Sequence, residues 1–271
     1  MLLSIPHSSV EHSELSNKAN HLLNLLPKSE FETLTANASR VFFTPKTVIF
    51  KPHEPIDRVY FPLKGAISLV SISQNGLMSD VLTISNEGMI GTVAFLGGCS
   101  FSNFAIVQTE CIAVSLSANL LQQMFYKNGE LQKILLLYTQ FLLSQALQNV
   151  FCSCHHTIEQ RLARWLIFFS DRAYASVTIR SKVAQKHSLR KSLPLIITQE
   201  ALANLLGVRR SSLSVVANRF RQQNLISYSR GRIVIQNYAA LKKVACECNH
   251  LISQEYFRLL NSSQSIAAKL K

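Results

Sequence analysis

The sequence predicts an α+β fold with an N-terminal antiparallel β-roll or jelly roll, a long dimerisation helix and a C-terminal winged helix-turn-helix. Three observations support this class. Short β-prone runs separated by turns fill the first part of the chain, a long stretch without proline follows, and two short helices with a hairpin pattern come last. The 271 residues suffice for two domains. We expect a flexible tail at 1–20, the roll at 21–126, the dimerisation helix at 127–156, the winged domain at 157–240 and a helical tail at 241–271.

The roll is predicted from short strands at near-even spacing, which is typical of antiparallel barrels and jelly rolls. The segments between them are rich in Pro, Asn and Gly, as at 51–55, 74–76 and 86–88. The β-prone runs are Val48–Phe50, Val59–Phe61, Ala66–Val70, Val81–Ile84, Phe104–Val107 and Cys111–Val114.

The dimerisation helix is predicted from residues 118–154, which contain no proline and one glycine. Side chains spaced alternately four and three residues apart form a stripe, the pattern of a helix that packs along a partner. The stripe comprises Leu131, Leu135, Tyr138, Leu142, Gln145 and Asn149. Its length favours a seam between two copies of the chain, and the alternative is a helix that packs on its own domain.

A second helix is expected to begin at Thr157, because Thr157 and Gln160 have the spacing of a capping box. After this helix, the stretch 175–193 is rich in serine and lysine. We interpret it as a mobile loop or a loose hairpin.

Composition excludes several classes of protein. Hydrophobic residues make up 48% of the chain and charged residues 16%, so a disordered polyelectrolyte is excluded. No uninterrupted apolar run reaches the ~18–20 residues of a membrane helix, and the N-terminus lacks the basic segment of a signal peptide. Six cysteines are too few for a disulfide scaffold at this length. We therefore expect a cytoplasmic protein without a membrane partner.

The net charge of +13 is unevenly distributed along the chain. Residues 1–150 carry a net charge of −1, whereas residues 151–271 carry +14. A near-neutral part joined to a strongly basic part indicates that the C-terminal part meets a polyanion.

The segment 197–235 has the pattern of a DNA-reading motif. Thr198 is suited to cap a first helix, Gly207 to end it in the left-handed conformation and Arg210 to open a second helix. The runs 225–228 and 232–235 then flank Ser229-Arg230-Gly231 and predict a hairpin wing. In such motifs the second helix enters the major groove of double-stranded DNA with its N-terminus first.

The polar residues of this motif are the expected DNA contacts. Arg210 is long enough for a bidentate contact to guanine, and it shares the leading face of the second helix with neighbouring serines and Val215. Arginines farther from that face are better placed for phosphates. The expected contacts are Thr198, Arg209, Arg210, Ser211, Ser212, Ser214, Val215, Arg219, Arg221, Arg230 and Arg232.

From about residue 24 onward, these motifs resemble the Crp/Fnr superfamily of bacterial transcription regulators. The strand at 59–61 with Gly65 is similar to the family's β-roll, and Glu87-Gly88-Met89-Ile90-Gly91 to its sensor loop. The segments 197–203 and 207–210 resemble its helix-turn-helix, and 159–166 resembles the helix after its dimerisation helix. The resemblance implies a cyclic-nucleotide-binding-like sensor roll and a homodimer that binds an inverted-repeat operator and works with RNA polymerase.

The expected sensor departs from the members that bind cyclic nucleotides. Those members place a Gly-Glu pair on the ribose and an Arg-Ser or Arg-Thr pair on the phosphate. The corresponding positions here are Gly91-Thr92 and Phe101-Ser102. No Lys or Arg occurs in the 62 residues from Gly65 to Tyr126, so a buried phosphate would lack a cation. We expect a degenerate pocket that does not bind cyclic AMP; alternatively, the roll binds an unidentified small ligand or protein partner that switches DNA binding.

No cofactor and no enzymatic activity are expected. Residues 1–98 contain no cysteine, which excludes the N-terminal iron–sulfur cluster of oxygen-sensing members, and His53 is interpreted as a surface residue rather than a haem ligand. The pairs Cys152/Cys154 and Cys246/Cys248 lack the C-x-x-C spacing of a zinc knuckle and fall in predicted helices, so a metal is not expected at either pair. No combination of nucleophile, base and acid has a catalytic signature.

Overall fold

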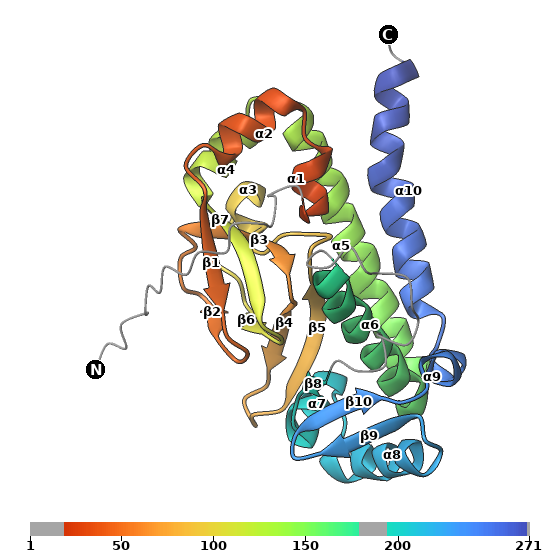
Figure 1. Cartoon of the computed structure of the whole chain (residues 1–271). Helices are drawn as coiled ribbons and strands as arrows, with labels where there is room; N and C mark the ends of the chain where they lie inside the picture. Colours follow the sequence, from red (N-terminus) through yellow and green to blue (C-terminus); the bar gives the residue numbers. More distant parts are fainter. Residues whose placement is uncertain (1–18, 179–193, 270–271) are drawn as a thin grey trace.

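The computed structural model of the chain describes residues 19–178 and 194–269. These residues form an N-terminal β-roll, long helices and a C-terminal winged domain (Figure 1). The predicted α+β class is therefore confirmed. Most of the expected tail at 1–20 and of the expected loop at 175–193 lies outside the described residues. Residues 175–178 continue helix α6 (Ile158–Thr178), so the loop prediction is wrong at its start.

Two antiparallel sheets make up the β-roll. One sheet has the strand order β1-β7-β3, and the other has the order β2-β6-β4-β5. Every predicted β-prone run overlaps one of these strands, and Ala66 of the run Ala66–Val70 lies just before its strand. Their bounds are β1 Ser39–Phe43, β2 Val48–Phe50, β3 Arg58–Lys64, β4 Ile67–Ile72, β5 Met78–Ile84, β6 Phe104–Val107 and β7 Cys111–Ser117.

Short helices close the roll at one end, where α4 leads into the long helix α5 (Figure 1). Asn20 caps the first of them and holds two other segments, because its side-chain amide donates to the carbonyls of Pro62 (2.9 Å) and Gly88 (2.8 Å). The helices are α1 His21–Leu25, α2 Lys28–Thr35, α3 Val93–Leu96 and α4 Ala118–Phe125.

Helix α5 (Glu130–His155) packs along the roll. This range lies within the helix expected at 127–156, and the chain turns between α4 and α5 with Asn128 in the left-handed conformation at φ 57°. The Tyr138 hydroxyl donates to the carbonyl of Met89 (3.1 Å) and accepts from its N–H (3.0 Å). This close approach requires glycine at position 88, since a Cβ there would overlap the Tyr138 ring.

The stripe predicted as a seam between copies instead faces the chain's own roll. Tyr138 is fully buried, and Leu131, Leu135 and Leu142 are buried with it. Gln145 donates to the Thr83 carbonyl (3.3 Å), and Asn149 donates to that of Val81 (2.9 Å). The interpretation of this stripe as a dimer seam is wrong, because its polar groups bond to the backbone of β5.

Among the described helices, α5 alone is long and apolar enough to cross a membrane by length and composition. Its buried side chains pack on the roll and on α10, and its buried polar groups bond to roll carbonyls. Packing within the chain accounts for only part of this apolar character, because Leu143, Leu147 and Val150 of α5 are exposed.

Two further long helices, α6 and α10 (Cys248–Lys269), contact each other. Helix α6 begins with the predicted capping box, in which the Thr157 N–H donates to Gln160 Oε1 (3.0 Å) and the Gln160 N–H donates to Thr157 Oγ1 (3.3 Å). Helix α10 lies along α5 (Figure 1). Its Tyr256 donates to the carbonyl of Glu87 (2.9 Å), which ties α10 to the roll.

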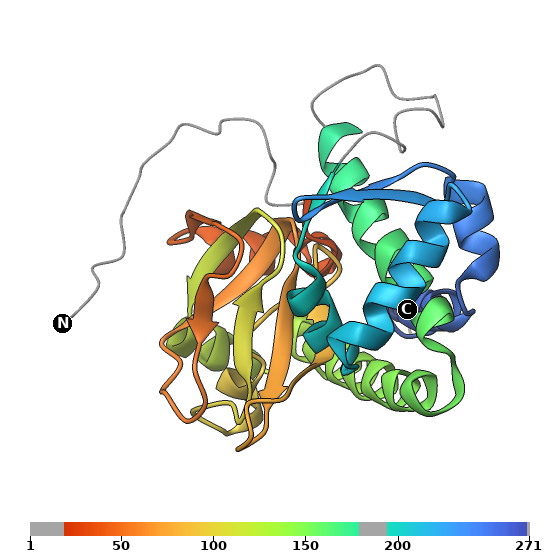
Figure 2. The same cartoon turned by 90° about the horizontal axis from the view of Figure 1, so that it is seen from below.

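The winged domain has its own hydrophobic core and lies beside the roll (Figure 2). Its three strands are ordered β8-β10-β9, and helix α7 packs against β5 of the roll. The elements are β8 Leu195–Ile196, α7 Gln199–Leu206, α8 Arg210–Gln222, β9 Ile226–Ser229, β10 Arg232–Ile235 and α9 Tyr238–Val244.

Candidate nucleic-acid interface and interdomain cavity

Helices α7 and α8 form the predicted helix-turn-helix. Thr198 caps α7 by accepting the Ala201 N–H at Oγ1 (3.2 Å). Gly207 ends α7 in the left-handed conformation at φ 62°, and the Val208 N–H returns to the Ala203 carbonyl (2.9 Å). Because glycine takes this conformation without strain, the turn is tight and α8 starts at Arg210, as the sequence predicts.

One face of α8 is packed and the other is exposed. Leu213, Val216, Ala217 and Phe220 are buried in the core of the domain. The opposite face exposes Arg210 and Ser211 at the N-terminal end, with Ser212 and Ser214 half-buried beside them. Val215 on this face is 60% exposed. An exposed valine among donors and acceptors suits a surface that reads base edges, because apolar side chains contact the thymine methyl group.

The wing is the two-stranded hairpin of β9 and β10. Ser229 pairs with Arg232, so Arg230 and Gly231 form a two-residue turn. Both have positive φ, 47° and 74°, which is the geometry of a type I′ turn. The turn exposes Arg230 at its tip and Arg232 beside it, where a basic hairpin can meet a phosphate backbone.

The remaining expected contacts differ in their surroundings. Arg209 precedes α8 and is exposed. Arg219 forms an ion pair with Glu159 at the start of α6, and Arg221 donates to the Asn218 side chain (3.4 Å). The sequence did not indicate the pairing of Arg219, because Glu159 lies 60 residues earlier in the chain.

The four residues of the expected degenerate pocket lie in the segment between β5 and β6. Gly91 has φ 108° and lies against Val59, and Thr92 is the buried N-cap of α3. The ring of Phe101 lies 6.2 Å from that of Phe50, and the Ser102 hydroxyl donates to Asn103 (3.2 Å). None of the four lines the interdomain cavity described next.

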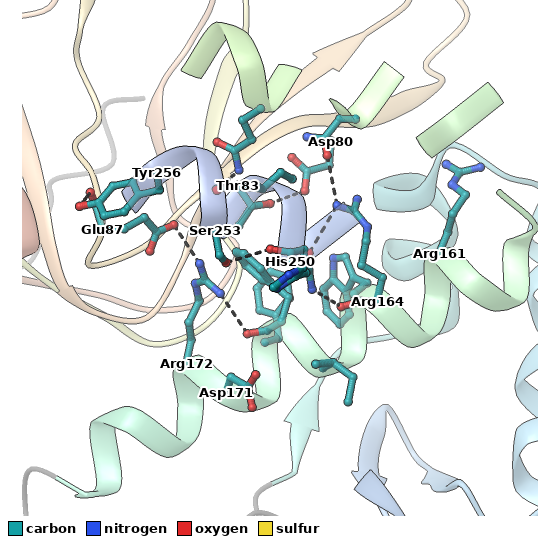
Figure 3. A pocket seen from close by; sticks show the side chains of 18 of the residues that line it. Asp80, Thr83, Glu87, Arg161, Arg164, Asp171, Arg172, His250, Ser253 and Tyr256 are labelled. Carbon is teal, nitrogen blue, oxygen red and sulfur yellow. Dashed lines mark hydrogen bonds and ion pairs between the residues drawn. The ribbon is translucent and has the colours of Figure 1, made fainter. Parts of the chain in front are cut away.

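A cavity of about 610 Å³ lies between the roll, α5, α6, α10 and the winged domain (Figure 3). Residues from distant segments meet in it, which is why the sequence did not reveal it. Glu87 of the sensor loop forms an ion pair with Arg172 of α6 (3.0 Å). The Arg172 guanidinium also stacks on the Phe168 ring at 3.3 Å from its centroid. This pair joins the sensor loop to the helix that leads into the winged domain.

Several buried polar atoms around this cavity have no hydrogen-bond partner among the described residues. They are Asp80 Oδ1, Gln145 Oε1, Arg164 Nε, Trp165 Nε1 and Arg172 Nε, and all five residues line the cavity. Burial raises the pKa of Asp80 to about 6, partly offset by hydrogen bonds from Thr83 and Ser68 and by the charge of Arg164. The cavity therefore presents both donors and acceptors.

Family models match both parts of the chain. A Crp-like helix-turn-helix domain matches residues 160–244, and a cyclic nucleotide-binding domain matches residues 40–128. The winged domain and the roll thus correspond to two known families of domains.

Similar proteins include regulators from several bacteria. The chain is 22% identical over 207 residues to the global nitrogen regulator of Nostoc sp., covering 74% of this chain and 86% of the relative. It is 25% identical over 206 residues to the global nitrogen regulator of Synechocystis sp., with coverage of 74% and 86%.

Solved structures share the fold. A transcriptional regulator of the CRP family from Thermus thermophilus superposes with a TM-score of 0.60 at 18% identity, covering 76% of this chain and 96% of that chain. The c-di-GMP responsive global regulator CLP of Xanthomonas campestris superposes with a TM-score of 0.59 at 16% identity, with coverage of 78% and 100%. With its cyclic nucleotide-binding-like roll followed by a Crp-like helix-turn-helix, the chain belongs to the Crp/Fnr family of DNA-binding transcription regulators.

Proposed function

We propose that this regulator binds an inverted-repeat operator as a homodimer. The single observation that carries the proposal is the exposed leading face of α8. On this face the Arg210 guanidinium offers hydrogen-bond donors, the Ser211 hydroxyl can donate and accept, and Val215 offers an apolar surface. Two such helices related by a two-fold axis reach successive major grooves about 34 Å apart. The exposed arginines of the wing and of α8 add phosphate contacts.

The dimer uses the exposed face of α5, opposite the face that packs on the roll. Along this face, positions spaced alternately four and three residues apart form a second stripe that no described part of the chain covers. Its members are Leu136, Gln140, Leu143, Leu147, Val150 and Cys154. Leu143, Leu147 and Val150 are each more than 60% exposed. A stripe with this spacing on a helix of 26 residues supports parallel packing of two copies.

Selection of bound fragments from genomic DNA by the purified full-length protein tests the proposal. The expected result is an inverted-repeat motif whose two halves are protected together in footprinting. Enrichment of fragments without a common motif would contradict sequence-specific binding. Arg210→Ala should relax the preference at one base pair by ~1–3 kcal/mol. The matched control is Arg258→Ala, since Arg258 is exposed on α10 and pairs with Glu255 away from α8.

We also propose where the regulator acts and which enzyme it contacts. It acts in the cytoplasm and meets RNA polymerase when it occupies an operator beside a promoter. Co-retention of purified RNA polymerase on a promoter fragment that carries the selected operator tests this contact. We expect retention to rise when the regulator is added and to return to its basal level when the operator is scrambled. Equal retention on the two fragments would contradict the contact.

The roll is proposed not to take a cyclic nucleotide. Thr92 and Phe101 stand where a ribose-binding carboxylate and a phosphate-binding guanidinium are needed, and Val59 fills the space beside Gly91. Isothermal titration of the full-length protein with cyclic AMP tests this point. We expect no heat of binding, and saturable binding in the micromolar range would contradict it.

A second candidate function is switching of DNA binding by a small polar ligand in the interdomain cavity. The unpartnered atoms of Asp80, Gln145 and Arg164 favour it, because buried polar groups in proteins are generally hydrogen-bonded. A ligand there would contact the roll and α6 at once and so bias their relative position. Thermal-shift screening of the full-length protein with cyclic nucleotides, fatty acids, redox agents and small zwitterions tests it. Stabilisation that Arg164→Met abolishes would support this function, and no stabilisation by any compound would favour a constitutive regulator.

A further inference from the structure

Three cysteines and a histidine from two distant segments converge at the junction between α5, α6 and α10. Cys152 and His156 lie at the C-terminal end of α5, and Cys246 and Cys248 lie where α9 gives way to α10. Their potential ligand atoms all lie within 4.8 Å of one another. Figure 1 shows the end of α5 beside α9 and the start of α10. Each segment supplies only two potential ligands, and the two segments together supply four.

The distances within the set fit a single tetrahedral ion. Cys152 Sγ lies 3.6 Å from Cys246 Sγ, and Cys248 Sγ lies 3.4 Å from His156 Nδ1. Zn–S bonds of about 2.3 Å in a tetrahedral site place neighbouring sulfurs about 3.8 Å apart. These two separations are therefore close to the edge length of such a tetrahedron, and all other separations within the set are at most 4.8 Å. A multi-iron cluster separates its ligands further, because the iron atoms and bridging sulfides lie between them.

Local structure explains how the four side chains come together. Cys152 and His156 are four residues apart, so they lie on the same side of the last turn of α5. Cys246 lies in the connection between α9 and α10 rather than in a helix, contrary to the expectation from sequence. Cys248 follows two residues later, at the start of α10. A short connection thus brings both sulfurs to the end of α5.

The groups around these four side chains are typical of a metal site. His156 turns Nδ1 toward Cys248 and Nε2 toward Glu247 Oε1 (3.4 Å), the carboxylate–histidine arrangement that orients metal-binding imidazoles. Gln148 donates to Cys248 Sγ (3.2 Å). The sulfurs of Cys152, Cys246 and Cys248 are buried. Arg164 of α6 lies close enough to interact electrostatically with Cys152 and Cys246. This positive charge offsets the net negative charge that three thiolates and one divalent cation carry.

We propose that Cys152, His156, Cys246 and Cys248 bind one Zn²⁺ in a closed structural site. The four protein ligands fill a tetrahedral coordination shell, so the ion has no open position for a substrate. The ion fastens the end of the proposed dimerisation helix, at its junction with α6, to the segment that leaves the winged domain. It thereby limits how the DNA-binding domain can move relative to α5. This site goes beyond DNA binding and does not depend on it.

The first experiment measures metal in the full-length protein. Cys99→Ser removes an exposed thiol outside the proposed dimer stripe and keeps all four proposed ligands, so it is the matched parent. Elemental analysis of this variant, purified under reducing conditions without added metal, is expected to give about one zinc per chain. Adding Cys246→Ser or His156→Ala should lower the zinc content at least tenfold. Zinc-free parent protein would overturn the proposal, and so would iron with acid-labile sulfide in place of zinc.

The second experiment keeps the proposal testable if a ligand variant fails to fold. Replacing zinc by Co²⁺ in the parent variant should give the intense visible bands of a tetrahedral cobalt ion and thiolate-to-cobalt charge-transfer absorption. Octahedral cobalt bands, or a Cys152–Cys246 disulfide together with no bound Co²⁺, would overturn it. Glu247→Gln, which keeps the ligands but removes the charge beside His156, should weaken Co²⁺ binding about 10-fold or more.

Discussion

Leu147 provides the most direct structural test of how two copies associate. It is 63% exposed on the face of α5 that points away from the roll, within the stripe proposed as the dimer seam. Substitution by alanine removes most of its apolar surface while keeping a good helix former, so the helix itself should persist. Loss of association would then report on packing between copies.

The magnitude follows from the exposed surface. Burying a whole leucine side chain stabilises by about 2 kcal/mol. Covering the 63% that is exposed gives about 1.3 kcal/mol per copy, and about 2.5 kcal/mol for the two copies of a dimer. Alanine retains part of this surface, so Leu147→Ala should cost about 2 kcal/mol of association, or about 30-fold in the dimer Kd.

Sedimentation equilibrium over a range of protein concentrations measures this Kd. The matched control is Leu77→Ala, because Leu77 is 73% exposed but lies in the connection between β4 and β5, away from the stripe. We expect the control to dimerise like the wild type. A wild-type protein that stays monomeric, or a Leu147→Ala protein with an unchanged Kd, would refute the assignment of this face.

Two further substitutions test the buried polar groups of Asp80 and Tyr138. Asp80 has a pKa of about 6 in the folded chain against 3.8 for a free side chain, so the folded state binds a proton that the unfolded state releases between these values. The Asp80 carboxyl should therefore contribute about 3 kcal/mol of stability in acid, lose most of it as the pH rises from 4 to 6, and contribute almost none above pH ~7. Asp80→Asn should abolish that slope, and urea unfolding at pH 4 and pH 7.5 measures it; an unchanged slope would contradict the argument. Tyr138→Phe should destabilise by ~1–3 kcal/mol, because both backbone groups of Met89 lose their buried partner. Thermal unfolding checks the loss, and wild-type stability would show that these bonds contribute little.

The fold and the DNA-reading motif were predictable from sequence because their signals are local. Capping by Thr198, the left-handed Gly207 and the turn at Arg230 and Gly231 each depend on residues a few positions apart. Short-range turn chemistry likewise marked the strands of the roll. These caps and turns depend little on the tertiary structure of the rest of the chain.

The wrong prediction of the dimer seam arose because α5 carries two stripes of side chains on opposite faces. In α5 both faces carry side chains at the same four-and-three spacing, and the more polar one ends in Gln145 and Asn149. Periodicity cannot say which stripe meets the roll, since that depends on backbone carbonyls of β5 to which these two residues bond. The exposed stripe can be recognised only once the buried one is placed against the roll.

The cavity and the cysteine–histidine set were not predictable for a different reason. Each combines residues separated by about a hundred positions, such as Glu87 with Arg172 and Cys152 with Cys246. Within its own segment, each cysteine pair lacks a recognised metal-binding spacing. The tertiary fold brings these segments together, with α10 packed along α5.

Fluorescence anisotropy on the selected operator tests the central claim, that α8 reads DNA sequence. The measurement compares the Kd for the operator and for a scrambled duplex, with wild-type protein and with Arg210→Ala, at several salt concentrations. We predict that the wild type prefers the operator by ~10³-fold or more and that Arg210→Ala loses ~10–100-fold of this preference. Equal affinity of the wild type for both duplexes, or an undiminished preference in Arg210→Ala, would contradict the account.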